Sequence, residues 1–157
     1  ITLQSVHSQT IRRFALTALL TCLVLTAGAV NRLRSPRASM EAPPGMTYDS
    51  TLSSSMGMDV FRSHTDGLII AIGMQQAADG VSAESLAKEF SLRGNGSYKS
   101  IAVTGRHTAY TGLGRNGRTF FAATDHPSDG NITVVLIVGD ISQADAERYI
   151  STLSITS

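Results

Sequence analysis

The chain has 157 residues, a formal net charge of +1, one cysteine and no tryptophan. This length suggests a single domain, and a lone cysteine excludes an internal disulfide and any cysteine-rich metal site. All five arginines of residues 1–40 lie in a stretch without acidic residues, so residues 41–157, which hold all 12 acidic residues, are mildly acidic and lack the basic surface typical of nucleic-acid-binding domains.

Residues 14–30 form an uncharged apolar run that follows Arg12 and Arg13. A basic stretch before an apolar run is typical of a secretory signal peptide, and Ala27 and Ala29 supply the small-x-small pattern of a cleavage site. The run is also just long enough to span a membrane. We therefore interpret residues 1–30 as a signal peptide or membrane anchor, with an organellar transit peptide as a further alternative. Export to the periplasmic or extracellular side of the cell envelope is expected.

Residues 31–55 are rich in serine and contain Pro36, Pro43, Pro44 and Gly45. Such a composition is typical of linkers. The sequence therefore predicts a flexible linker over residues 31–55 and a folded domain over residues 56–157.

The domain opens with predicted strands over residues 58–64 and 68–75. Between them, Asp66-Gly67 favours a two-residue hairpin turn that would place Phe61 opposite Ile72. A helix is predicted over residues 82–92, because Ser82 suits its N-cap and Gly94 can end it.

Four more strands are predicted, over residues 98–104, 107–115, 118–124 and 132–138. Asn116-Gly117 predicts a hairpin that pairs Leu113 with Phe120. The last of these strands is apolar on both faces, which indicates a central position covered on both sides. A final amphipathic helix is expected over residues 143–153. We expect one core that contains Phe61, Ile72, Phe90, Phe121, Leu136 and Ile150.

These elements give an α+β fold in the order ββ-α-ββββ-α, a mostly antiparallel sheet with helices packed on it. The order resembles the PsbP-like domain, a family that includes small bacterial envelope proteins of the DcrB type. The resemblance covers residues 56–157 and also rests on Gly105 after the third strand and on the closing apolar strand and helix. The aromatic opening of the family's first hairpin is missing, with Ser55-Met-Gly-Met58 in its place. The resemblance implies an accessory or binding module rather than an enzyme.

The glycine motif Gly112-Leu-Gly-Arg-Asn-Gly117 matches a dinucleotide fingerprint, but a strand follows it where a helix is required, so we expect no nucleotide. Two sets of residues could supply metal ligands, namely Asp125, His126 and Asp129 for a hard cation and Met56, Met58 and His64 for copper. Neither has regular ligand spacing. We therefore predict no metal ligands, no catalytic residues and no cofactor.

The Asn116-Gly117 hairpin would also place Arg115 directly opposite Arg118. Like charges in that position are mildly destabilising, so we interpret the pair as a contact for an anionic partner. The sequence thus predicts an exported, membrane-associated, non-enzymatic accessory or binding module whose partner is an envelope protein or an anionic membrane surface, without nucleic acid or nucleotide. The alternative is a small copper carrier or a small enzyme.

Overall fold

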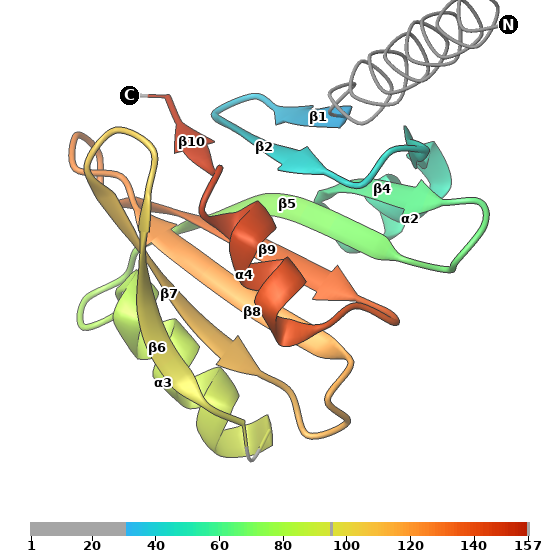
Figure 1. Ribbon diagram of the computed structural model, residues 1–157. Helices are drawn as coiled ribbons and strands as arrows, with labels where there is room; N and C mark the ends of the chain where they lie inside the picture. Colours follow the sequence, from blue (N-terminus) through green and yellow to red (C-terminus); the bar gives the residue numbers. More distant parts are fainter. Residues whose placement is uncertain (1–30, 95, 157) are drawn as a thin grey trace, which may run out of the picture. The chain divides into compact units, whose positions relative to one another are not determined.

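The computed structural model describes residues 31–94 and 96–156, which form two antiparallel sheets and three helices (Figure 1). The seven-stranded sheet has the order β3-β4-β5-β9-β8-β7-β6 and the three-stranded sheet the order β1-β2-β10. The fold is therefore α+β and mostly antiparallel, as predicted. The elements in chain order are β1 (Asn31–Ser35), β2 (Ala38–Ala42), β3 (Met46–Tyr48), α2 (Ser50–Met56), β4 (Asp59–Ser63), β5 (Ile69–Gln76), α3 (Ala83–Gly94), β6 (Tyr98–Val103), β7 (His107–Leu113), β8 (Thr119–Asp125), β9 (Asn131–Val138), α4 (Gln143–Ile150) and β10 (Ser154–Ile155).

The predicted linker over residues 31–55 is wrong, because these residues are folded. They form the β1–β2 hairpin, β3 and α2, and Leu33 and Met40 are among the most deeply buried side chains of the protein. The prolines and the glycine that suggested a linker lie in turns: Pro36 joins β1 to β2, and Gly45 adopts a φ of 86° that favours glycine. The serines lie in β1, β2 and α2. The second partner of β2 is β10, more than 100 residues later in the chain, so nothing in the local composition reveals this pairing.

The two predicted hairpins differ in outcome. In the β7–β8 hairpin Leu113 faces Phe120, which confirms the predicted register. In the β4–β5 hairpin Phe61 faces Ile70 rather than Ile72, so the predicted register is wrong by two residues. The reason is a loop longer than Asp66-Gly67 alone: the Ser63 N–H donates to the Leu68 carbonyl, and Ser63 Oγ donates to the Asp66 carboxylate inside the loop. A shift of two residues leaves Phe61 on the same face.

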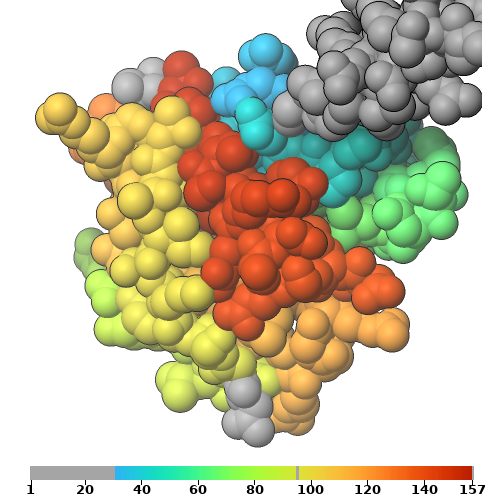
Figure 2. Space-filling view, viewed as in Figure 1, coloured from blue at the N-terminus to red at the C-terminus, as the bar shows by residue number. Residues whose placement is uncertain are grey.

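Both faces of the central strand β9 are covered, as predicted, and the result is two cores rather than one. Successive residues of a strand point to opposite faces. One face packs under the β1–β2 hairpin and α4, whose adjoining surfaces are visible in Figure 2. The other face packs against α3. The expected single core is therefore divided into Phe61, Ile72 and Ile150 on the first face and Phe90, Phe121 and Leu136 on the second.

Candidate functional site

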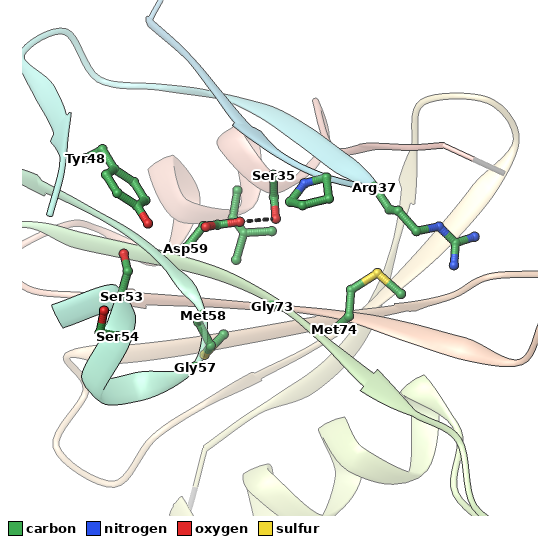
Figure 3. A pocket seen from close by; sticks show the side chains of 12 residues that line it. Ser35, Arg37, Tyr48, Ser53, Ser54, Gly57, Met58, Asp59, Gly73 and Met74 are labelled. Carbon is green, nitrogen blue, oxygen red and sulfur yellow. Dashed lines mark hydrogen bonds between the residues drawn. The ribbon is translucent and has the colours of Figure 1, made fainter. Parts of the chain in front are cut away.

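An open cavity of about 430 Å³ lies where β4 begins and β5 ends (Figure 3). Three parts of the chain surround it: the β1–β2 turn, the segment of β3, α2 and the loop after α2, and the facing ends of β4 and β5. Its volume falls in the range of small-molecule sites, roughly 300–1,000 Å³. The lining residues are Ser35, Pro36, Arg37, Tyr48, Ser53, Ser54, Gly57, Met58, Asp59, Ile72, Gly73 and Met74.

The helix α2 is held against β4 by polar contacts at both of its ends. Asp49 caps it, since its Oδ1 accepts a hydrogen bond from the Leu52 N–H at 2.9 Å. Gly57 ends it with a φ of 66° and donates to the Ser53 carbonyl. Ser53 Oγ donates to the Asp49 carbonyl and accepts from the Val60 N–H, at 2.7 and 2.9 Å. These bonds fix the wall of the cavity that α2 provides.

Asp59 carries the carboxylate of the cavity. Ser35 Oγ donates to its Oδ2 at 2.6 Å, which ties the end of β1 to the start of β4. At the mouth, Tyr48 leaves 55% of its surface exposed and packs edge-on against Phe61, with ring centroids 5.7 Å apart. In Figure 3 the Tyr48 hydroxyl is directed toward the interior of the cavity, where the Asp59 carboxylate lies.

The close approach of Met58 to Gly73 shapes the floor of the cavity. A Cβ atom at Gly73 would lie only 2.8 Å from Met58 Cγ, so any larger residue there would displace the thioether side chain. Met74, the next residue of β5, is 41% exposed and lines the same cavity. The two methionine side chains point in different directions in Figure 3. They supply apolar walls to the cavity from separate sides.

Arg37 borders the cavity, but its guanidinium is already engaged. Nη1 forms an ion pair with the Asp129 carboxylate, and Nη2 lies 3.3 Å from His126 Nδ1 and 3.4 Å from the Thr156 carbonyl. The cluster joins the β1–β2 turn to the loop before β9 and to the C-terminal segment. The positive charge of Arg37 is therefore compensated within the protein by Asp129.

His126 is only 2% exposed and uses both ring nitrogens. Because a guanidinium can only donate, Nδ1 must accept from Arg37, which leaves the proton on Nε2. Nε2 then donates to Thr133 Oγ1 at 2.6 Å. Burial lowers the pKa of His126, and the Arg37 charge lowers it further. The neutral imidazole is thus a structural hydrogen-bonding group.

The predicted arginine pair lies in the loop between β7 and β8. The Gly117 N–H donates to the Gly114 carbonyl, and Gly117 has a φ of 67°, so Arg115 lies within a turn and Arg118 follows the glycine. The two arginines are exposed but are not partners in the ladder, which corrects the predicted facing pair. Five residues, 114–118, connect the two strands in place of the expected two-residue turn, and Asn116 Oδ1 stabilises this wider loop by accepting from the Arg118 N–H.

A second cavity, of about 470 Å³, adjoins this loop. Phe90 and the backbone of two glycines line it, and Arg93 and Arg115 border it from α3 and from the loop. Arg93 is ion-paired with Glu89 at 2.5 Å. The exposed arginines near this cavity thus come from two elements that are distant in sequence.

The structure does not bring either set of candidate metal ligands together. Asp125 Oδ1 accepts from the Ala83 N–H at 2.9 Å and so caps α3, while Asp129 pairs with Arg37. Met58 and His64 flank opposite ends of β4, roughly 20 Å apart at about 3.3 Å per residue. Over residues 31–94 and 96–156, no three His, Cys, Asp or Glu side chains are grouped as a metal would require.

Sequence reasoning missed the cavity because half of its lining belongs to the stretch interpreted as a linker. The available signal was the alternation of apolar and polar residues in Ala38–Ala42, which is typical of a half-buried strand. The possible cleavage residues Ala27 and Ala29 lie outside the described residues. In the part of the chain that the structure describes, no helix has the length and apolar character of a membrane span. No protein-family model and no curated protein matches this chain.

Proposed function

We propose that the chain is a non-enzymatic binding module of the cell envelope, exported and associated with the membrane, and that the Asp59 cavity is its ligand site. The observation that carries this proposal is the cavity itself. Its size suits a small ligand, its walls mix hydroxyl, carboxylate and apolar groups, and rigid strands hold two of its sides. Export and membrane association rest on the apolar run over residues 14–30.

The polar groups of the cavity favour binding over catalysis. Ser35 is the hydroxyl closest to an activating group, but its partner Asp59 is a carboxylate, which is a poor base for a serine hydroxyl. His126, which contacts Arg37, has both nitrogens occupied by Arg37 and Thr133. A nucleophile paired with a base of suitable pKa is therefore missing from the described lining. The resemblance to the PsbP-like domain stays a prediction that favours the same conclusion.

A copper carrier is the alternative function, and one observation favours it. Met58 and Met74 both line the cavity, and thioether sulfurs are ligands for Cu(I). Titration of the purified chain with Cu(I) separates the two functions. Stoichiometric binding that is lost in Met74→Leu would support the carrier, whereas retention of binding in that variant would remove the cavity from consideration as a copper site.

Blocking the cavity tests the binding proposal. Ser54 is an exposed residue of α2 that lines the cavity, so Ser54→Trp fills the space without disturbing a core. Ser55→Trp is the matched control, since Ser55 is the next exposed residue of the same helix and lies outside the lining. A mixed library of cationic, anionic and neutral fragments is screened against the full chain by ligand-observed NMR. We expect binders that Ser54→Trp abolishes and Ser55→Trp preserves.

Two outcomes would contradict this proposal. The first is a library in which no fragment binds the wild-type chain, and the second is binding that Ser54→Trp leaves intact. Fractionation of cells that express the tagged full-length chain tests the envelope location separately. A product that is entirely soluble in the cytosol and keeps residues 1–30 would contradict export.

A further inference from the structure

The acidic residue of the cavity is not neutralised by the basic residue of the cavity. Asp59 is its one acidic residue and Arg37 its one basic residue among the described lining. Arg37 is neutralised by Asp129, and Figure 3 shows its guanidinium directed away from Asp59. Across residues 31–94 and 96–156, the hydrogen-bond partner of the Asp59 side chain is the neutral hydroxyl of Ser35. A negative charge inside the cavity thus has no cation of the described protein beside it.

Ser35 and Asp59 together offer hydrogen-bond acceptors but no free donor. Ser35 uses its single proton in the bond to Asp59 Oδ2, so its oxygen can only accept further hydrogen bonds. Asp59 Oδ1 is a second acceptor. A ligand group that contacts both Asp59 and Ser35 must therefore supply donors, and a ligand anion would meet a carboxylate of the same sign.

The remaining walls suit a hydrocarbon stem. Ile72 lines the cavity and is 1% exposed, while Met58 and Met74 provide thioether surfaces that adapt to varied shapes. At the mouth, the exposed ring of Tyr48 offers a π face to a positive charge.

We propose that the Asp59 cavity binds an organic cation, a primary ammonium or guanidinium group on a short aliphatic stem. This inference rests on the proposed function and names the ligand class of that site. The same chemistry occurs in a free amine and in the lysine or arginine side chain of a partner protein. An ammonium supplies three donors and no acceptor, which matches the acceptor pair of Asp59 and Ser35.

Isothermal titration calorimetry on the full chain tests the inference with probes of matched shape. Pentylamine, pentanol and pentanoate differ in the charge of the head group, and butylguanidine presents a guanidinium in place of the ammonium. We expect pentylamine to bind at least about tenfold more tightly than pentanol, since a hydrogen bond to a charged group contributes more than a neutral one. Pentanoate should bind most weakly. Tighter binding of Nα-acetyl-lysine amide than of pentylamine would identify a protein side chain as the source of the cation. Tighter binding of pentylamine would identify a free amine as that source.

Two variants assign the effect to Asp59. Asp59→Asn keeps the shape and an acceptor for Ser35 but removes the charge, so it should weaken pentylamine binding by about tenfold and leave pentanol unchanged. Asp79→Asn is the control, because Asp79 is an exposed acid outside the cavity, and it should bind like the wild type.

Equal affinities of the wild type for pentylamine and pentanol, or full binding of pentylamine by Asp59→Asn, would overturn the cation inference. The probe comparison requires no variant, so it stands even if Asp59→Asn does not fold. If neutral or anionic fragments bind and Ser54→Trp blocks them, the proposed function survives while the cation inference fails. If no fragment binds, both fail.

Discussion

The packing of α3 on β7 leads to a sharp stability prediction at Gly112. A Cβ atom at this position would lie 2.4 Å from Ser91 Oγ, 3.1 Å from the Ala87 carbonyl oxygen and 3.4 Å from Phe90 Cδ1. The first distance requires a movement, and the second involves helix backbone that cannot rotate away. Because insertion of a methyl group into a packed site costs about 1–3 kcal/mol, Gly112→Ala should lower the free energy of unfolding by about 2 kcal/mol.

Denaturant unfolding of the full chain measures this loss, and Ser91 supplies the control. Ser91→Ala removes the atom with the closest contact, so the double variant should recover part of the loss, about 0.5–1.5 kcal/mol as a coupling between neighbouring residues. Recovery should be incomplete, because the Ala87 carbonyl remains. The opposite result is informative. An alanine placed without strain would stabilise the protein by about 0.4–1 kcal/mol, so a stabilised Gly112→Ala would refute this packing of α3.

Three further predictions concern a turn, a buried histidine and the exposed arginines. Arg106 has a φ of 63°, so Arg106→Gly should raise the thermal midpoint, by the equivalent of about 1 kcal/mol, and a lower midpoint would contradict the turn geometry. The folded-state pKa of His126 lies below its unfolded value of about 6.5, so the free energy of unfolding should be highest above that pH and should fall as the pH drops below it. Denaturant unfolding as a function of pH should show this loss of stability in the wild type. If the same loss persists in His126→Gln, another group causes it. The double variant Arg115→Ser with Arg118→Ser should keep wild-type stability, but a smaller fraction of it should sediment with anionic vesicles at low salt. An unchanged fraction would show that the loop is an ordinary solvated turn.

Local patterns in the sequence predicted much of the main sheet. The β7–β8 register follows from Asn116-Gly117 with alternating apolar residues on both sides, and β9 follows from a run that is apolar on both faces. The limits of α3 follow from its cap at Ser82 and its end at Gly94. In each case the determining residues are close together in the chain, so the energy that fixes the element is local.

The features that could not be predicted depend on contacts between distant segments. The β1–β2 hairpin is stabilised by burial of Leu33 and Met40 against the main sheet and by pairing with β10, which its serine- and proline-rich sequence does not indicate. The cavity arises only when this hairpin comes to lie over the start of β4. Asp59 and Ser35 are individually unremarkable residues, and their significance as a pair appears only in the folded chain.

The methionine methyl groups provide the most direct test of the cavity as a cation site. Met58 and Met74 line the cavity, whereas Met40 is fully buried outside its lining and serves as an internal control. A methyl-labelled full-length chain is titrated with pentylamine and its methyl NMR spectrum is followed. We predict saturable shifts at Met58 and Met74, with Met40 unmoved and with the response lost in Asp59→Asn. Binding of pentylamine that leaves the Met58 and Met74 signals unchanged would contradict this account.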